Sequence, residues 1–386
     1  MIIVHVSLNS PYNDYWGYQE NLLPKYQSRL GNTVHIITTT LIHYNGKIKS
    51  VLPQTYTLQE GVTVHRIQKK SFCSKKLTEI LNYYDIYDLL CKLKPDYIFF
   101  HGCMNWSIYD VVKYKNKYKC FIAQDNHLDN NIGYSSITFK DKIRKLYYIL
   151  LNMHSKFKIN VFYGVTPCRI QYLSEYFHIR SNNIKLLIMG ADDEAMHIED
   201  RSIIRYRTRK ELNVSDKEFV LVSGGKFDLK KGIGDLMDAV NSIQSDSVRL
   251  VLFGSPQPEF MNDFSLKLSN KIIYIGWIKA SDVYKYFYAA DLIVFPGQHS
   301  VLWEQAAASK TPCVFKKWDG MNHINNGGNS MLIDCTNCNY LTKVIESLLF
   351  TDKYYKLLEK ARSSITDIYL YSNIAAETFI DYKNYH

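Results

Sequence analysis

The sequence has no long hydrophobic run. None of its 386 residues lies in an uninterrupted apolar stretch near the roughly 18 residues that a membrane-spanning helix requires. Residues 1–7, Met-Ile-Ile-Val-His-Val-Ser, also lack the charged and long apolar regions of a secretory signal peptide, and they predict a first β-strand instead. These two absences lead us to expect a cytoplasmic protein.

Cysteine is present, but not in a pattern that builds a disulfide framework or a zinc site. The 8 cysteines are scattered, and the close pair Cys335 and Cys338 has no second CxxC or histidine pair to complete a set of zinc ligands. We expect ordinary reduced thiols, as in a cytoplasmic protein.

Acidic residues are fewer than basic ones. The chain has 37 Asp and Glu against 47 Lys and Arg, which gives a formal net charge of +10. Such an excess favours anionic partners, namely nucleic acid, nucleotide phosphates or an acidic membrane surface. The sequence has no helix-turn-helix, RNA-binding-sheet or zinc-finger signature, so we expect no nucleic-acid partner.

The order of apolar runs indicates the fold class. Short apolar runs predict strands at residues 1–8, 34–39, 62–67, 97–100, 120–123, 185–188, 219–222, 249–253, 271–275, 292–295 and 311–315. Helical patterns lie between them, at residues 21–29, 77–93, 140–158, 232–243, 281–289, 301–309 and from 354 onward, with Ser281 as an expected N-cap. This alternation indicates an α/β fold with parallel sheets covered on both faces.

The length and one polar stretch suggest how the chain is divided. A chain of 386 residues corresponds to two domains of ordinary size, and residues 194–217 are polar and charged. We therefore expect a first domain at residues 1–190 and a second at 191–368. Residues 369–386 are expected to form a C-terminal helix that packs back on the first domain.

The stretch 289–315 reads as a strand, a tight turn, a helix and a second strand. Pro296 and Gly297 break the apolar run 292–295, and a helix is expected to begin near Ser300. In such a βαβ unit the ligand edge lies where the strand passes to the helix. Glu304 lies one turn into this helix, where its carboxylate can accept hydrogen bonds from the two hydroxyls of a ribose. The alternative is a capping or surface glutamate favoured by the helix dipole alone.

The stretch 222–240 combines a strand, a glycine pair, a basic loop and a helix. Gly224 and Gly225 would let backbone N–H groups approach a phosphate, and Lys226 and Lys231 could hold two charges of a diphosphate. Neither GxxxxGK[ST] nor GxGxxG is present. For this loop alone, solvated surface lysines remain the alternative interpretation.

Residues 140–158 predict a basic amphipathic helix. Its apolar positions recur at helical spacing among basic residues: Ile143, Leu146, Tyr147, Leu150, Leu151 and His154 among Lys140, Lys142, Arg144, Lys145, Lys156 and Lys158. Such a helix can lie on an anionic membrane. It can equally face the core and expose only its basic side.

Four segments together resemble the GT-B glycosyltransferases of family four, also called glycosyltransferases group 1. Residues 224–233 (GGKFDLKKGI) resemble the family's GRxxxxKG segment, and residues 295–314 resemble its PS…E…EAxAxGxPV segment. Residues 188–192 are similar to the interdomain PNGVD, and residues 14–21, with Gly17, are similar to the N-terminal glycine loop. The four segments follow in the family's order and at compatible spacings, so the resemblance extends over nearly the whole chain.

The resemblance implies a GT-B fold, in which two Rossmann-like, doubly wound domains face each other across a cleft. It also implies metal-independent, retaining transfer of a sugar from a nucleotide-diphosphate donor, with no cofactor. The N-terminal domain would bind the acceptor and the C-terminal domain the nucleotide sugar.

The matching positions assign a role to several residues. Lys226 stands where the family has Arg, and it would act with Lys231 to neutralise the diphosphate leaving group. Glu304 would bind the ribose, and Gly17 would approach the phosphates. Gly276, Trp277 and Ile278 match the segment whose backbone reads the base. Backbone N–H groups of Ser300, Val301 and Leu302, at the helix start, could bind phosphate or sugar oxygens. Gly225 and His299 complete the expected donor-binding residues.

One position departs from the family pattern. The first glutamate of the family pair corresponds here to Pro296, with Gln298, His299 and Ser300 nearby. Because that glutamate touches the donor sugar, the identity of the sugar is left open. The family also has a histidine after the strand that ends here at Ala123.

Asp125 or His127 would fill the place of that histidine and contact the sugar as it acquires oxocarbenium character. His101, at the end of the preceding strand, is a weaker candidate. Asp125 and His127 are therefore carried forward, with Lys226 and Lys231, as the expected catalytic residues.

The function expected is a hexosyltransferase that uses a UDP-sugar and a glycan or lipid-linked acceptor in bacterial surface polysaccharide or glycoconjugate synthesis. The basic, aromatic N-terminal half favours a peripheral place on the inner face of the plasma membrane. Two alternatives stay open: a catalytically silent nucleotide-sugar-binding subunit, and a nucleotide-sugar epimerase of the same architecture.

Overall fold

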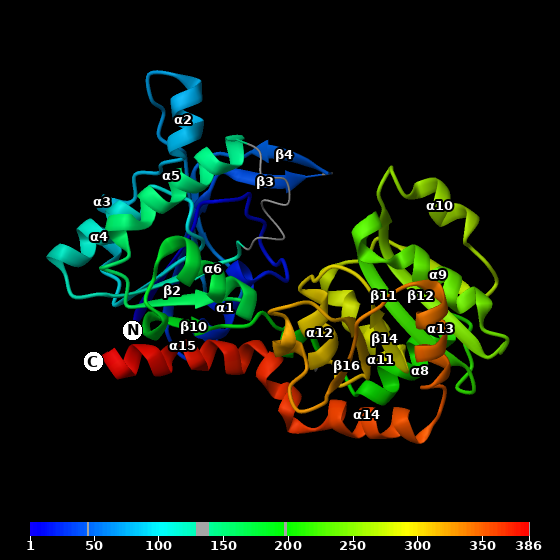
Figure 1. The fold of residues 1–386 in the computed structure, drawn as a ribbon. Helices are drawn as coiled ribbons and strands as arrows, with labels where there is room; N and C mark the ends of the chain where they lie inside the picture. The colour runs from blue at the N-terminus through cyan, green and yellow to red at the C-terminus, as the bar shows by residue number, and fades with distance from the viewer. Residues whose placement is uncertain (45, 129–138, 197–198, 386) are drawn as a thin grey trace. The chain divides into compact units, whose positions relative to one another are not determined.

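The chain folds into two units, each built around one extended sheet (Figure 1). The computed structural model describes residues 1–44, 46–128, 139–196 and 199–385, without the side chains of residues 139–141, 144 and 145. The first unit comprises Met1–Ile188 and Ile374–His386, and the second comprises Met189–Asn373.

The first unit contains an eight-stranded sheet with β1 near its middle. Its strand order is β10 (Ile184–Leu186), β9 (Val161–Gly164), β8 (Phe121–Asn126), β7 (Tyr97–Phe100), β1 (Ile2–Ser7), β2 (Thr33–Thr39), β6 (Thr63–Ile67) and β5 (Gln54–Thr57). Neighbouring strands are parallel, except that β5 runs antiparallel to β6. A separate antiparallel hairpin joins β3 (Leu41–Tyr44) and β4 (Lys47–Ser50). The strand order reverses between β1 and β7, which is where such sheets bind ligands.

Helices cover this sheet. They are α1 (Gln19–Arg29), α3 (Tyr87–Leu93), α4 (Ile108–Lys117), α5 (Phe139–Ser155), α6 (Pro167–Phe177) and most of α15 (Tyr371–Tyr385). The short helix α2 (Lys75–Leu81) belongs to the same unit but buries none of its residues. Thr166 shows why one of them begins where it does: its side chain accepts from Arg169 N–H, and Pro167 occupies the first turn. The C-terminal helix begins at Tyr371. Its Tyr382 ring stacks on the Tyr97 ring, with 6.0 Å between the ring centroids.

The single helix predicted over residues 77–93 is wrong. The structure has two short helices, α2 and α3, separated where Asn82 takes a left-handed conformation with φ of 42°. The backbone N–H groups between them bond to side chains instead: Tyr84 N–H donates to Ser107 Oγ and Ile86 N–H donates to Asp110 Oδ2. These tertiary contacts outweigh the helical pattern of the sequence.

The second unit contains a parallel six-stranded sheet in the order 3-2-1-4-5-6 of the doubly wound fold. The strands are β13 (Ile272–Gly276), β12 (Val248–Pro256), β11 (Phe219–Phe227), β14 (Leu292–Phe295), β15 (Cys313–Lys316) and β16 (Ser330–Ile333). β14 is buried throughout, as expected for a central strand with apolar residues on both faces. The order reverses between β11 and β14; of the predicted donor residues, Lys231 follows β11 and residues 299–304 follow β14.

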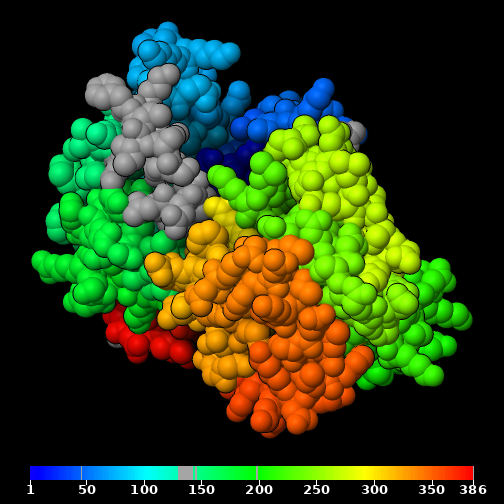
Figure 2. All heavy atoms as spheres, turned by 45° about the vertical axis from the view of Figure 1, so that its right-hand side comes forward, coloured from blue at the N-terminus to red at the C-terminus, as the bar shows by residue number. Residues whose placement is uncertain are grey.

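Helices on both sides cover the second sheet. They are α7 (Asp193–Met196), α8 (Arg201–Glu211), α9 (Ile233–Ser242), α10 (Met261–Leu266), α11 (Val283–Ala289), α12 (Leu302–Ala308), α13 (Cys338–Glu346) and α14 (Asp352–Arg362). The predicted Ser281 N-cap is wrong, because Ala280–Asp282 forms a 3-10 turn and α11 begins at Val283 without a side-chain cap. In Figure 2 the orange segment, which includes α13 and α14, makes up part of this unit's surface.

Across the described part of the chain, no helix combines the length and the apolar character needed to cross a bilayer.

Candidate functional site: the turn between strands β11 and β14

Two backbone segments meet at the point where the order of the second sheet reverses. One follows β11 and contains a 3-10 turn at Leu229–Lys231, and the other follows β14 and runs from Pro296 to Ser300. Gln298 N–H donates to the Lys230 carbonyl at 2.9 Å, which holds the segments together. A Cβ added to Gly297 would lie 2.2 Å from the Lys231 carbonyl carbon, so only glycine permits this approach.

This contact holds Lys231 over the second segment. Its Nζ donates to the carbonyl of Gln298 at 2.8 Å and to that of His299 at 3.2 Å. Burial lowers the pKa of the Lys231 ammonium, while Asp228 acts in the opposite direction. An ammonium has three N–H donors, so one remains for an anionic ligand.

Lys226 is placed differently from the prediction of a basic loop. The glycine pair and Lys226 belong to β11, which continues to Phe227 in register with β12. Gly225 pairs with Gly254, and the strand is longer than expected because these small residues let the two backbones approach. Lys226 is exposed, and it extends from the end of the strand rather than from a loop.

Substituting Gly297 by alanine is expected to destabilise the second unit. The new methyl group would overlap the Lys231 backbone, and overpacking of this kind typically costs about 1–3 kcal/mol. Thermal unfolding of the full chain should therefore shift down by several degrees. Gly276→Ala is the control: nothing lies within 4 Å of its added Cβ, so its cost is confined to the positive φ of 80° at that position. An equal or smaller shift for Gly297→Ala than for Gly276→Ala would contradict this description of the turn.

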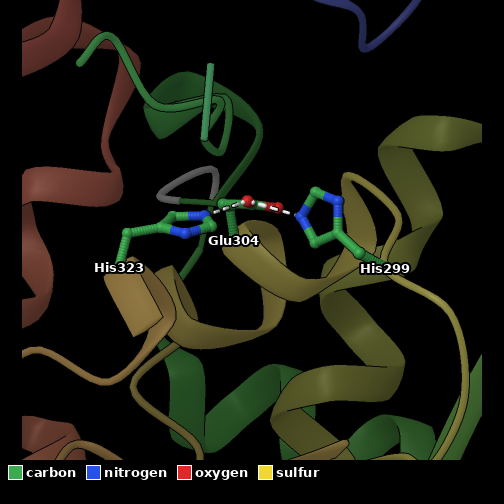
Figure 3. A group of neighbouring side chains, drawn as sticks. All are labelled: His299, Glu304 and His323. Carbon is green, nitrogen blue, oxygen red and sulfur yellow. Dashed lines mark hydrogen bonds and ion pairs between the residues drawn. The ribbon is translucent and has the colours of Figure 1, made fainter. Parts of the chain in front are cut away.

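Glu304 lies at the centre of a buried cluster with two histidines (Figure 3). His299 Nε2 and His323 Nε2 lie 2.8 and 2.9 Å from the same carboxylate oxygen, Glu304 Oε1. Burial alone would raise the pKa of Glu304, but the histidines outweigh it and lower this pKa to about 2. The other oxygen, Oε2, is buried and has no hydrogen-bond partner among the described residues. Glu304 thus presents one held oxygen and one oxygen able to accept from a ligand.

His323 was missed by the sequence analysis. It stands on a 3-10 turn, Asn322–Ile324, between β15 and β16, and Tyr369 Oη donates to its carbonyl at 2.7 Å. Its distance of 19 residues from Glu304 follows no helical or strand period. Only the order of the strands brings the two together.

The cluster also offers a possible set of metal ligands, since the three ligand atoms lie within 4.8 Å of one another. To bind a metal through Nε2, each imidazole would need its proton on Nδ1. A metal-bound histidine usually donates that proton to a second group. His323 Nδ1 is buried and has no such partner in the described residues. The arrangement therefore suits two N–H donors on a carboxylate better than a metal site.

The depressed pKa of Glu304 predicts a loss of stability in acid. A carboxyl whose pKa falls from 4.5 unfolded to about 2 folded stabilises the fold above pH 4.5, and this contribution is lost as the pH falls toward 2. The shift corresponds to about 3 kcal/mol. Chemical unfolding of Glu304→Gln between pH 7 and pH 2.5 should show a deficit that shrinks with acid. The exposed Glu359→Gln serves as the control; a pH-independent Glu304→Gln deficit would refute the assignment.

Other predicted donor residues lie near this turn or on the sheet edge. Ser300 and Val301 lead into α12, which begins at Leu302, and Leu302 Cδ1 would lie 3.2 Å from a Cβ on Gly225. Gly276 is the last residue of β13, and Trp277 and Ile278 follow it; β13 is separated from β11 by β12. Trp277 is 77% exposed, as a ring available for stacking would be.

The remaining predicted residues belong to the first unit. Gly17 is half-buried in the segment before α1. Asp125 is fully buried in β8, where its Oδ1 accepts from Gly102 N–H at 2.6 Å and its Oδ2 lies 2.9 Å from His101 Nδ1. His127 follows β8 with its side chain 35% exposed and Nε2 3.3 Å from Asp125 Oδ2. Burial alone would lower the pKa of His127, but the neighbouring Asp125 carboxylate outweighs burial, so this pKa is raised.

Comparisons with known proteins bear on the family and the fold. Residues 218–350 match the family described as glycosyl transferases group 1. An uncharacterized glycosyltransferase of Methanocaldococcus jannaschii is 22% identical over 216 residues, which is 54% of this chain and 55% of that protein. The match thus spans about half the length of this curated relative.

Solved structures match over the whole chain. Sucrose-phosphate synthase from Thermosynechococcus elongatus superimposes with a TM-score of 0.71 at 16% identity, covering 100% of this chain and 98% of that one. Anabaena HepE, solved with UDP and glucose, superimposes with a TM-score of 0.69 at 13% identity, covering 99% of each chain. The chain therefore has the GT-B fold, with two Rossmann-like domains. Its residues 218–350 are the part that matches the group 1 glycosyltransferases.

Proposed function

We propose that this protein is a retaining glycosyltransferase. It moves a sugar from a nucleotide-diphosphate donor, for which we propose a UDP-sugar, to a glycan or lipid-linked acceptor. The observation that carries the proposal is Lys231, held at the sheet reversal of the group 1 segment with one N–H donor uncommitted. Support comes from the solved neighbour that holds UDP and glucose. We place the reaction in bacterial surface polysaccharide or glycoconjugate synthesis.

The donor is proposed to bind where the segment after β11 meets the segment after β14. Lys231 faces the diphosphate, and Lys226 adds a second charge from the end of β11. Lys226 stands in place of an arginine, so it supplies charge without bidentate geometry. Glu304 Oε2 accepts from the ribose hydroxyls, while His299 and His323 hold Oε1. Trp277, with Gly276 and Ile278, contacts the base.

The lysines would act mainly when the glycosidic bond breaks. Negative charge then develops on the diphosphate, and fixed cations stabilise that charge more than they stabilise the bound donor. The same positive charge is the reason for proposing transfer without a metal ion.

In the first unit we assign the contact with the sugar to His127 rather than to Asp125. Both oxygens of Asp125 already have polar partners, Gly102 N–H at Oδ1 and His101 Nδ1 at Oδ2. His127 keeps about a third of its side chain exposed. Gly17 is proposed to approach the phosphates.

The test is release of nucleoside diphosphate from a panel of nucleotide sugars, with and without crude lipid and glycan acceptors. We expect release that depends on an acceptor. Release with no acceptor and a changed sugar would instead indicate an epimerase. Pro296, at the position of the family's first glutamate, is the observation that favours a silent subunit. Donor affinity without any release would support that alternative.

Helix α5 supports a membrane-bound acceptor. Part of the predicted apolar stripe faces away from the core: Ile143, Leu146 and Leu150 are 50–55% exposed, whereas Leu151 is buried. The side chains of Lys140, Arg144 and Lys145 lie outside the described residues, but Lys142 and Lys158 are exposed. An exposed apolar face beside basic residues suits an anionic bilayer surface.

Sedimentation with vesicles tests this membrane contact. The protein should bind phosphatidylglycerol vesicles more strongly than phosphatidylcholine vesicles, and the double variant Leu146→Glu with Leu150→Glu should lose that binding. The control is Leu266→Glu, at a leucine that is 85% exposed in the second unit. Equal binding by the double variant and the control would show that α5 is not the contact.

A further inference from the structure

A buried line of polar side chains connects the C-terminal helix of the first unit to Asp125. We call Thr378, Gln27, His5, His101 and Asp125 the polar chain. They come from α15, α1, β1, the end of β7 and β8, and each is at most 3% exposed. Five separate elements thus place polar groups along one path through the core, where each group needs a partner.

The distances along the polar chain are those of hydrogen bonds. Gln27 Nε2 donates to Thr378 Oγ1 at 3.0 Å, and Gln27 Oε1 lies 2.6 Å from His5 Nε2. His5 Nδ1 lies 3.0 Å from His101 Nε2. His101 Nδ1 in turn lies 2.9 Å from Asp125 Oδ2.

Counting donors and acceptors along the polar chain fixes its protons. Thr378 Oγ1 donates to the Ala375 carbonyl at 2.7 Å, so it accepts from Gln27. Gln27 Oε1 can only accept, so His5 Nε2 carries a proton. The carboxylate of Asp125 also can only accept, so His101 Nδ1 carries a proton. One proton must still lie between His5 Nδ1 and His101 Nε2.

One histidine therefore carries two protons. Burial and the neighbouring His101 lower the pKa of His5 to about 3, so His5 is the neutral ring. Burial alone would raise the pKa of Asp125, but His127 and His101 outweigh burial, so the pKa of Asp125 lies below its usual range. His101 is the ring that contacts the Asp125 carboxylate, at 2.9 Å, so we assign the second proton to it.

We propose that the polar chain holds His101 as an imidazolium and makes it a positioning residue, which pairs with Asp125 and fixes that carboxylate behind His127. The Gln27 amide decides this state, because its oxygen faces His5. With the amide turned round, its nitrogen would donate to His5 Nε2, and every ring in the chain would be neutral.

The consequence for the site lies at His127. An imidazolium at His101 offsets part of the Asp125 charge that His127 experiences. Other groups act on the same pair: Glu20 and Arg169 on His127, and Tyr97 and Cys103 beside Asp125. The role in transfer rests on the proposed function, whereas the protonation state does not.

Two substitutions of Gln27 separate the two states. Gln27→Glu keeps an acceptor toward His5 and should preserve the imidazolium. Gln27→Met removes the acceptor, so His101 should become neutral with its proton on Nδ1. Asp125 then loses a cationic partner, and the titration of His127 should move to higher pH. Gln27→Glu should leave that titration near its wild-type position.

The measurement is nitrogen NMR of the full chain labelled in histidine, with His101 and His127 assigned from variants. We expect both His101 nitrogens to be protonated at pH 7.5 in the wild type and in Gln27→Glu. A wild-type His101 with one proton would overturn the proposal, and this spectrum decides the matter even if Gln27→Met fails to fold. The pH profile of kcat should follow the His127 titration; a shifted titration with no detectable transfer would count against the proposed function alone.

Discussion

Replacing Lys231 by alanine should lower kcat/KM for sugar transfer by about 10²–10³-fold, the loss typical when one preorganised group that stabilises developing charge is removed. Lys231 is held by two carbonyls of the opposite segment, so it meets the diphosphate without first being ordered. Most of the loss should appear in kcat, because charge on the leaving group grows as the bond breaks. The measurement is steady-state release of nucleoside diphosphate.

The neighbouring Lys230 supplies the control. It is exposed, and only its backbone takes part in the turn, through its N–H to Asp228 and its carbonyl to Gln298. Lys230→Ala should therefore retain nearly full activity. Lys226→Ala should fall between the two, because its exposed ammonium is more screened by water. A Lys231 variant as active as the Lys230 variant would show that the Lys231 ammonium does not contribute to sugar transfer.

Glu304→Gln should raise the Kd for the nucleoside diphosphate by about 10–100-fold, since hydrogen bonds to a charged group contribute about 1.5–3 kcal/mol. The amide can still accept from His299 and His323 through its oxygen, but its NH₂ group would then occupy the place of Oε2. A ribose hydroxyl would meet a donor instead of an acceptor. Calorimetry with UDP measures the change.

Two ligands make this second prediction specific. Pyrophosphate lacks the ribose, so its affinity should be unchanged in Glu304→Gln and reduced in Lys231→Ala. A 2′-deoxy nucleotide should bind the wild type more weakly than UDP does, but the variant should hardly distinguish the two. Glu359→Gln, on the exposed face of α14, controls for the loss of one charge. Weaker pyrophosphate binding in Glu304→Gln would mean that Glu304 supports the phosphate-binding segments and does not bind the ribose.

The fold was predictable where apolar runs are buried on both faces. The strand at residues 292–295 was predicted with the bounds that β14 has, because a buried parallel strand is apolar throughout. Prediction failed where side chains distant in sequence decide the backbone. Ser107 and Asp110 bind the backbone between α2 and α3, and the glycines of β11 extend that strand through Lys226.

The motifs pointed to candidate site residues, but not to the side chains that hold those residues in place. The helical spacing pointed to Glu304, and the glycine-lysine segment pointed to Lys231. Nothing in the sequence joins His323 to Glu304 or Gln27 to His5, since these contacts depend on strand order and helix packing. The motifs predicted which residues to examine. The structure adds how each is held and which atoms are left for a ligand.

The central claim is that the second unit binds a nucleotide diphosphate through Lys231. A thermal-shift panel of UDP-, GDP-, ADP- and CMP-sugars on the wild type and Lys231→Ala tests it most directly. At a hundredfold excess over Kd a bound donor stabilises the fold by roughly 2.7 kcal/mol. We predict a clear shift with one nucleotide class in the wild type and its loss in the variant. The absence of a shift with any nucleotide, or an equal shift in both proteins, would contradict the account.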